Sequence, residues 1–349
     1  MLSQLPMFRT ALVLIARNEA GQIERLLQSI KPWVDDMLVL DTGSIDATPA
    51  LAAAAGARVA HFAWCDDFAA ARNAALDLAN ADWHVVLDAD EWLISGGEAL
   101  AALRHTRPDF VGSIELLDQF HDGQQQVARS RLSRVLPGQL RYAGRIHEQV
   151  VHNLPLRPLA LQIGHDGYLP DRLQSKKGRN KALLALALAQ RPDDAYLCYQ
   201  MGKDCSVYED YAEAEHFFAR SADLLSDSPT WWADLVARRL FGLKQLKQHE
   251  AAIQFAETQL VVCAESPDFF FALGDLLLDW AADAPEQAEL LLPMIEDAWR
   301  RCLEIGERPE QSGAVAGRGS HLAAHNLALV LEGTGRAEEA AAMRQAYAA

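Results

Sequence analysis

The sequence DWHVVLDADEWL, residues 82–93, decides the fold of the first half of the chain. Its residues 83–87 are apolar or aromatic apart from one histidine, which is typical of a short buried strand. The acids Asp88, Asp90 and Glu91 follow directly. Because an unpaired carboxylate is costly to desolvate, the strand must end where these acids begin, at an exposed edge.

The spacing of Asp88-Ala89-Asp90 indicates what this edge binds. In extended backbone, residues two apart project to the same side, so the two carboxylates suit one divalent cation, or one cation and a ribose hydroxyl. The carboxyl edge of an open α/β sheet is also where ligands bind. A solvated acidic turn is the alternative, and the triplet alone does not distinguish the two.

The composition favours two globular domains. The chain has 349 residues, half of them hydrophobic, and a net charge of −16. Residues 1–180 contribute −3 (18 Lys and Arg against 21 Asp and Glu) and residues 181–349 contribute −13 (14 against 27), which argues against broad nucleic-acid binding. We expect a cytoplasmic protein with reduced cysteines, because a signal segment, a membrane-length apolar run and a CxxC pair are all missing from the sequence.

Strand and helix patterns alternate through the first hundred residues. Apolar runs at 11–16, 37–40 and 58–61 predict further strands, and helix patterns lie between them. Polar residues follow these strands, as Asp88 follows the strand at 83–87. The alternation predicts a parallel sheet covered by helices. Neither the dinucleotide fingerprint GxGxxG nor a P-loop occurs.

Four motifs in this region carry a resemblance to a known family. They are LIARNEA (14–20), VLDTGSIDAT (39–48), DDFAAARNAAL (66–76) and VVLDADE (85–91). Together, in this order, they resemble the nucleotide-binding half of family 2 glycosyltransferases, which have the GT-A fold. The resemblance implies an α/β GT-A domain with a Rossmann-like mixed sheet, a UDP-sugar donor, and Mn²⁺ or Mg²⁺ as cofactor.

The resemblance also implies roles for individual residues. Asp41 would accept a hydrogen bond from the uracil ring, Asp88 would approach the ribose or the cation, and Asp90 would hold the cation against the diphosphate. A hard dication there stabilises the charge that builds on the departing UDP. The residues expected to line the nucleotide-sugar site are Arg17, Asn18, Glu19, Asp41, Arg72, Asp88, Ala89 and Lys177. Arg72 is expected to clamp a phosphate or an acidic residue there, rather than being a surface residue.

Beyond residue 109 the pattern changes to alternation with period two, which predicts a hairpin at 110–117 and 127–136 beside the parallel sheet. Five arginines fall in this region: Arg129, Arg131, Arg134, Arg141 and Arg145. We expect most of them to form the polar face of the hairpin, and the role of Arg145 is open.

The segment Gly144-Arg145-Ile146-His147-Glu148 resembles the His-Glu element of a subgroup of these transferases. Inverting transfer needs one base for the proton of the acceptor, and Glu148 is the predicted base, with His147 orienting it. The alternative is that His147 and Glu148 shape the acceptor pocket while Glu91 or Asp118 removes the proton.

A strand at 159–163 ends near His165, which is a predicted third metal ligand opposite Asp90, besides Asp88. Lys177 lies in the basic run that follows, which either closes over the diphosphate or caps the next helix.

From residue 181 onward helix formers dominate, and the spacing of Gly202, Ala214 and Phe218 approximates a tetratricopeptide repeat. We therefore predict two domains, residues 1–180 (GT-A) and 181–349 (an all-α tetratricopeptide-like solenoid). The acidic solenoid suits a basic or peptide acceptor, or a homodimer contact.

The function predicted from the sequence is metal-dependent inverting transfer of a sugar from UDP to a peptide, a protein or a cell-surface glycan. The competing prediction is a catalytically silent GT-A domain that serves as a scaffold, with the repeats as a protein-binding module. Asp41, Asp88, Asp90 and Glu148 are all present, which favours the enzyme.

Overall fold

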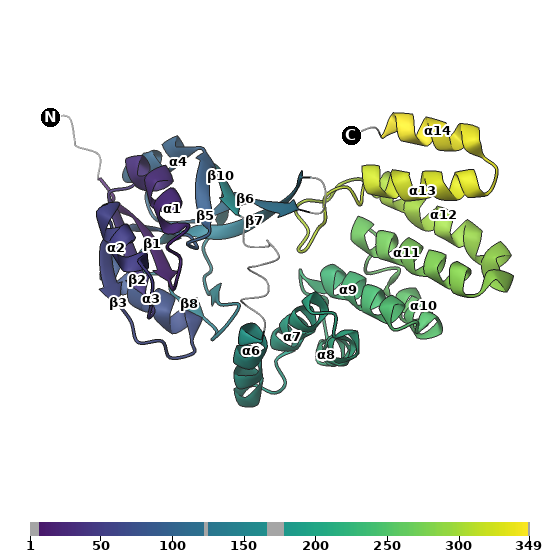
Figure 1. The fold of residues 1–349 in the computed structure, drawn as a ribbon, viewed down its shortest axis with the longest axis horizontal. Helices are drawn as coiled ribbons and strands as arrows, with labels where there is room; N and C mark the ends of the chain where they lie inside the picture. The colour runs from purple at the N-terminus through teal and green to yellow at the C-terminus, as the bar shows by residue number, and fades with distance from the viewer. Residues whose placement is uncertain (1–6, 122–124, 166–177, 348–349) are drawn as a thin grey trace. The chain divides into compact units, whose positions relative to one another are not determined.

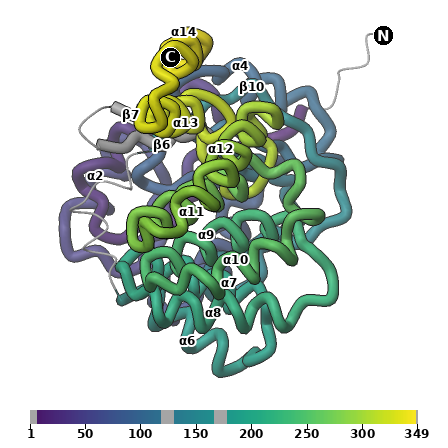
Figure 2. The backbone as a smooth tube through the Cα atoms, turned by 90° about the vertical axis from the view of Figure 1, so that its right-hand side faces the viewer, coloured from purple at the N-terminus to yellow at the C-terminus, as the bar shows by residue number. Residues whose placement is uncertain are grey.

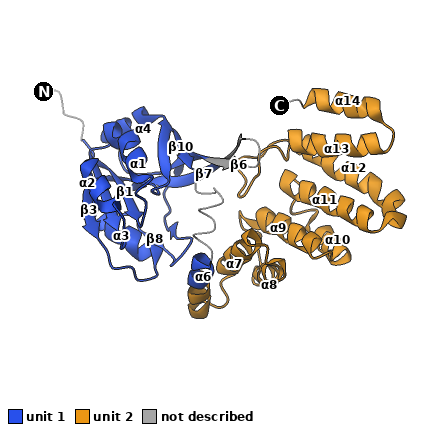
Figure 3. Cartoon of the chain, in the orientation of Figure 1, with its two compact units in different colours: residues 1–183 blue, residues 184–349 orange. Residues whose placement is uncertain are grey.

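The computed structural model describes residues 7–121, 125–165 and 178–347. By its internal contacts the described chain separates into two compact units, residues 1–183 and 184–349 (Figure 3). The boundary falls inside helix α6 (Arg179–Gln190). The expected fold class, a GT-A α/β domain followed by a tetratricopeptide-like helical domain, is confirmed (Figure 1).

A mixed sheet forms the centre of the first unit. Among the described residues it has eight strands in the order β3-β2-β1-β4-β7-β6-β10-β5. The strands are β1 (Thr10–Ala16), β2 (Asp36–Asp41), β3 (Arg58–His61), β4 (Trp83–Val86), β5 (Glu91–Ser95), β6 (Val111–His121), β7 (Gln125–Pro137) and β10 (Leu156–His165). Strands β3, β2, β1 and β4 are parallel, and β7 joins β4 antiparallel.

The sheet curls, and the reason lies in the link between β4 and β5. These strands are fourth and eighth in the sheet, which in a flat sheet would separate them by about 19 Å. Only residues 87–90 join them, a reach of about 17 Å when fully extended. The curl brings β5 back toward β4, and the predicted ligand-binding acids lie in this link.

Helices cover both faces of the sheet, because successive apolar side chains of β1 point to opposite faces and both sets must be buried. Leu12 and Leu14 pack with side chains of α1 (Ile23–Ile30) and α2 (Thr48–Ala54). Ala11 and Val13 pack on the opposite face with Ala75 and Leu76 of α3 (Phe68–Ala79). A strand buried on both faces reads as a continuous apolar run, which is why the sequence revealed it.

The predicted hairpin is confirmed as β6 and β7, and its expected turn lies mostly in residues 122–124, outside the described residues. The strand β5 and the two-residue strands β8 (Tyr142–Ala143) and β9 (Gln149–Val150) were not predicted. Helix α4 (Gly97–Ala102) follows β5. Strands of two residues carry too few side chains for alternation to be detectable.

His84 on β4 is buried in this sheet and gives the domain a predictable acid sensitivity. Burial, together with the positive charge of Arg141, lowers its pKa to about 4. Between pH 6.5 and pH 4 the unfolded chain therefore takes up a proton that the folded chain does not. Folding stability should fall over this window as pH falls, by about 3 kcal/mol in total.

Urea unfolding of the wild type and of a His84→Leu variant, compared between pH 7 and pH 4, tests this expectation. The variant should lose less stability on acidification, whatever its stability at pH 7. Parallel pH profiles of the two proteins would show that His84 is not the cause.

The second unit is a row of antiparallel helix pairs (Figure 2). The described helices are α7 (Ala195–Val207), α8 (Tyr211–Asp223), α9 (Trp232–Gln245), α10 (His249–Gln259), α11 (Pro267–Asp283), α12 (Ala288–Ile305), α13 (His321–Gly333) and α14 (Ala337–Ala346). Gly202 faces the ring of Phe218, and Gly274 faces Trp299, where an added Cβ would lie under 3 Å from ring atoms. The small residues that suggested repeats are therefore the points of close helix approach.

Residues 306–320, between α12 and α13, form a loop within the last repeats. The segment binds acids of the preceding helices: Arg318 donates to Asp268 at 2.8 Å, as does the amide of Val315 at 3.2 Å. The backbone at Gly313 lies against the side chain of Asp234. Part of the acidity of the helical unit is thus neutralised within the chain.

Candidate functional site

The candidate site lies at the carboxyl edge of β2, β1 and β4. Residue pairing places Ala16 of β1 beside Asp41 of β2, and Val13 beside Val86 of β4. The loops after these three strands therefore lie on one edge of the sheet. These loops carry the predicted residues of the motifs after β1, β2 and β4.

The loops after β1 and β2 are tied to each other by hydrogen bonds. The amide of Asn18 donates to Ser44 Oγ at 2.9 Å, and Asn18 Oδ1 accepts from the amide of Ile45 at 2.9 Å. The amide of Glu19 donates to Thr48 Oγ1 at 2.7 Å. Asn18 adopts a φ of 59°, in the left-handed region that asparagine tolerates. Arg17 is exposed beside them.

Asp41 ends β2 as a buried carboxylate. It accepts hydrogen bonds from the amides of Gly43 and Ser44, at 3.2 and 3.1 Å, and lies 3.2 Å from His61 Nδ1. Burial raises the pKa of Asp41, but these hydrogen bonds outweigh burial and the net pKa is lowered. The group is therefore an ionised acceptor at neutral pH, as recognition of a ring N–H requires.

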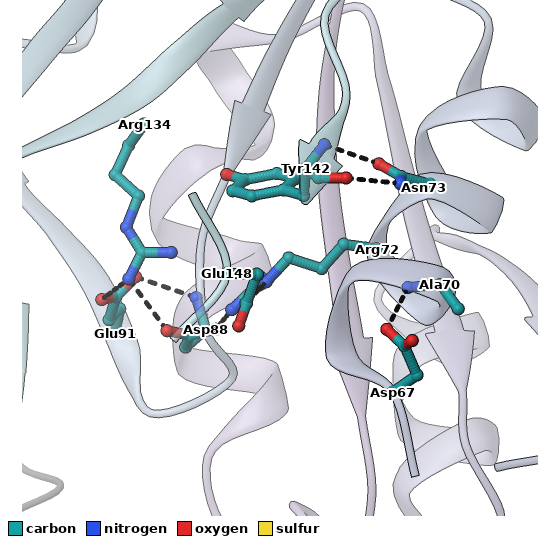
Figure 4. Close-up of polar contacts among 9 residues, drawn as sticks. All are labelled: Asp67, Ala70, Arg72, Asn73, Asp88, Glu91, Arg134, Tyr142 and Glu148. Atoms are coloured by element: carbon teal, nitrogen blue, oxygen red, sulfur yellow. Dashed lines mark hydrogen bonds and ion pairs between the residues drawn. The ribbon is translucent and has the colours of Figure 1, made fainter. Parts of the chain in front are cut away.

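Asp88 lies at the centre of a network of alternating charges (Figure 4). Arg72 Nη2 donates to Asp88 Oδ1 at 2.6 Å, and Arg134 Nη2 donates to Asp88 Oδ2 at 2.9 Å. Each arginine also binds a glutamate: Arg72 Nε lies 2.5 Å from Glu148 Oε1, and Arg134 Nη2 lies 3.1 Å from Glu91 Oε1. We call these residues the charge network.

The charge network shifts the pKa values of Asp88 and Glu91 in opposite directions. Burial alone would raise the pKa of Asp88, but Arg72 and Arg134 hold it far below its usual value. Glu91 is nearly fully buried, and burial together with the charge of Asp88 raises its pKa to about 7 even though Arg134 opposes the rise. Asp88 is therefore held ionised between two guanidinium groups.

Residues 142–148 lie along α3, so that two motifs separated in sequence form one substructure. The side chain of Asn73 binds the backbone of Tyr142 twice, at 2.9 and 2.8 Å. The amide of Phe68 donates to the carbonyl of Arg145 at 2.8 Å, and Arg145 Nη1 donates to the carbonyl of Asp66 at 2.7 Å. The motif DDFAAARN is thus the support for the segment that carries His147 and Glu148.

Asp90 and His165 face each other, as their places at strand ends predicted. Asp90 Oδ2 lies 3.5 Å from His165 Nε2, and Asp90 is buried. Within the described part of the chain, no three His, Cys, Asp or Glu side chains gather closely enough to enclose a metal ion. The oxygen and imidazole donors of this pair still fit Mn²⁺, with water or phosphate oxygens completing the ligand set.

The remaining predicted site residues lie in different environments. Ala89 is buried, His147 is exposed with a φ of 50°, and Lys177 lies outside the described residues. The expectation that most hairpin arginines form a polar outer face is wrong for Arg134. Its guanidinium is buried between acids because β7 pairs directly with β4, a neighbour that the alternation pattern cannot reveal.

With this geometry in place, the comparison with protein families decides the identity of the domain. Residues 11–114 match the model named Glycosyl transferase family 2. These residues form a family 2 glycosyltransferase domain. The match runs from β1 into the first residues of β6 and includes Asp41, Arg72 and the Asp88-Ala89-Asp90 triplet, and it confirms the resemblance seen in the motifs.

The names of two curated relatives each refer to one of the two features, the repeats or the glycosyltransferase. A TPR repeat-containing protein of Synechococcus elongatus is 41% identical over 217 residues, which are 56% of this chain and 52% of that protein. The SPbeta prophage-derived glycosyltransferase SunS of Bacillus subtilis is 24% identical over 219 residues, 60% of this chain and 52% of the relative. The chain thus spans about half the length of these relatives.

Solved structures resemble each part of the chain only distantly. A structure of MamA covers 51% of this chain and 91% of its own, with 16% identity and a TM-score of 0.38. A Mycobacterium tuberculosis glucosyl-3-phosphoglycerate synthase, bound to Mn²⁺, UDP and product, covers 32% and 44%, with 27% identity and a TM-score of 0.27. Among the described residues, no helix is both long enough and apolar enough to cross a bilayer.

Proposed function

We propose that this protein is a metal-dependent inverting glycosyltransferase that moves a sugar from UDP to an acceptor. The observation that carries the proposal is the grouping of Asp41, the charge network and the Asp90–His165 pair around one edge of a family 2 glycosyltransferase sheet. Ligands of open α/β sheets bind at this edge. The synthase noted above was crystallised with Mn²⁺ and UDP, which makes both reasonable partners for this chain.

The binding roles follow from the groups present. The ionised carboxylate of Asp41 would accept the uracil N–H, and the neighbouring loop of Arg17, Asn18 and Glu19 would line the nucleotide. Asp90 and His165 would hold the cation, which when bound neutralises charge on the leaving diphosphate. Asp88 is the less suitable ligand, since both of its oxygens already accept from arginine.

The transfer itself needs a proton acceptor. In an inverting reaction, the acceptor oxygen or sulfur attacks the anomeric carbon while the bond from that carbon to the β-phosphate oxygen breaks. The acceptor proton goes to a base, and UDP leaves with the electron pair of the broken bond. Glu148 is our proposed base, because its carboxylate is held by Arg72 next to Asp88, with the exposed His147 beside it.

The acceptor is proposed from the second unit. A row of acidic helix pairs suits an extended basic peptide better than an anionic lipid surface, and a homodimer through these helices is the other use of the unit. A scaffold without catalysis is the competing function. It is favoured by the relative from Synechococcus, whose name refers to its repeats alone.

Thermal unfolding with nucleotides tests the proposal against the scaffold. A ligand that binds the folded state raises the melting temperature by mass action. The purified chain should be stabilised by UDP and by one or more UDP-sugars when Mn²⁺ is present, and the effect should vanish with EDTA. If no nucleotide shifts the transition with or without metal, the enzyme proposal fails and the scaffold takes its place.

A further inference from the structure

Two consecutive residues of α3 reach the segment that carries the proposed base. Asn73 uses both ends of its amide on the backbone of Tyr142, and Arg72 binds Glu148 and Asp88 with different nitrogens of one guanidinium group. Figure 4 shows both side chains leaving the helix toward this segment.

Arg72 is more deeply buried than an arginine that binds a donor phosphate would need to be. Its side chain is 9% exposed, its Nε and Nη2 are occupied by Glu148 and Asp88, and its Nη1 is buried without a hydrogen-bond partner. Nε and Nη2 are therefore each directed at a carboxylate, and Nη1 is closed off from solvent. A donor phosphate would have to displace one of these carboxylates to bind this guanidinium.

The segment that Arg72 holds has little regular structure of its own. Between the two-residue strands β8 and β9, Gly144 has a φ of 102° and His147 a φ of 50°. A left-handed backbone at a residue with a side chain is maintained only where the surroundings fix it. The contacts of α3 with residues 142, 145 and 148 supply that support.

We infer that Arg72 and Asn73 are positioning residues for Glu148. Arg72 fixes the Glu148 carboxylate relative to Asp88 at the donor edge, and Asn73 fixes the backbone from which the base is presented. The planar guanidinium sets both the distance and the angle between the two carboxylates, which the point charge of a lysine does not. The inference rests on the proposed transferase function, and of the two partners expected for Arg72, a phosphate or an acidic residue, it takes the acidic residue.

The test separates binding of the donor from turnover. Arg72→Ala, Arg72→Lys and Asn73→Ala are made in the full chain, and affinity for UDP with Mn²⁺ is measured by calorimetry. Turnover is UDP release from whichever of UDP-glucose, UDP-galactose and UDP-N-acetylglucosamine the wild type hydrolyses. We expect UDP affinity to stay within about threefold and kcat to fall about 100-fold, the scale of a displaced general base.

Added guanidinium chloride at millimolar concentration should restore at least part of the kcat of Arg72→Ala, and none of that of Asn73→Ala. Rescue by the missing group distinguishes positioning from a general loss of structure. Arg141→Ala is the matched control, because Arg141 also joins α3 near this segment, through Asp77 at the surface. It should leave both readouts unchanged.

The outcomes distinguish a failure of the positioning role from a failure of the proposed transferase function. If Arg72→Ala loses UDP affinity as strongly as kcat, Arg72 is a donor-binding residue and the inference is overturned. Unchanged kcat in Arg72→Ala and Arg72→Lys overturns it as well. Absence of UDP binding and hydrolysis in the wild type defeats the proposed function itself, which is a different result from a defect confined to the variants.

Discussion

Replacing Asp88 with asparagine should lower the free energy of local unfolding around β4 by about 2 kcal/mol, less than the roughly 3–5 kcal/mol lost with one partner of a fully buried ion pair, because the Asp88 side chain is 36% exposed. The carboxylate lies between Arg72 and Arg134, whose side chains are only 9% and 14% exposed. An amide offers one acceptor where the carboxylate offers two charged oxygens. One guanidinium is then left facing an N–H donor.

Hydrogen exchange of the backbone amides of β4 and α3 measures this change in the full chain. Exchange reports local unfolding free energies, so it avoids the assumption that a chain with two compact units unfolds in a single step. Protection should fall in β4 and α3 of Asp88→Asn and stay constant in the helices α9 to α14.

The matched control is Asp77→Asn, which removes the partner of Arg141 at the surface. That pair is 2.5 Å apart, but its side chains are 64% and 37% exposed, so the loss should stay below about 1 kcal/mol. Equal small effects of the two substitutions would mean that water compensates Arg72 and Arg134, and that the charge network does not stabilise the fold.

Strands β1, β2 and β4 of the parallel half were predictable because they are buried on both faces and so appear as apolar runs. The edge strand β3 is only partly buried, and its bounds were still predicted, as residues 58–61. The order of the later strands was not predictable. Alternation in β7 shows that one face is polar, but only the pairing of Val85 with Val135 shows that this strand enters the sheet beside β4.

The candidate site also has one part that the sequence predicted and one part that it did not. Asp90 and His165 were expected to face each other because both lie at strand ends, and the structure brings them to 3.5 Å. The partners of Asp88 come from α3 and β7, 16 residues before it and 46 after it, and spacing within one motif carries no information about such contacts. The two-arginine environment of Asp88 therefore needed the fold.

Replacing Asp90 with asparagine should reduce the Mn²⁺-dependent affinity for UDP by about 100-fold or more. Loss of a residue that only supports a metal ligand reduces metal affinity by about 10- to 100-fold, so loss of a direct ligand should reach or exceed the upper end of that range. Asp90 is buried, and its carboxylate faces the imidazole of His165. Asparagine keeps the shape of the side chain and one oxygen, but it removes the charge that attracts a hard dication. UDP affinity measured with EDTA should be the same in variant and wild type.

Calorimetric titration with UDP, in Mn²⁺ and in EDTA, gives both numbers from the same preparations. Asp109→Asn is the control for loss of one negative charge, since Asp109 is exposed and pairs only loosely with Arg157 at 3.7 Å. It should keep the full metal dependence. If Asp90→Asn also kept the full metal dependence of UDP affinity, other groups would have to hold the cation. The assignment of Asp90 and His165 as its ligands would then be wrong, even if the protein proved to be a transferase.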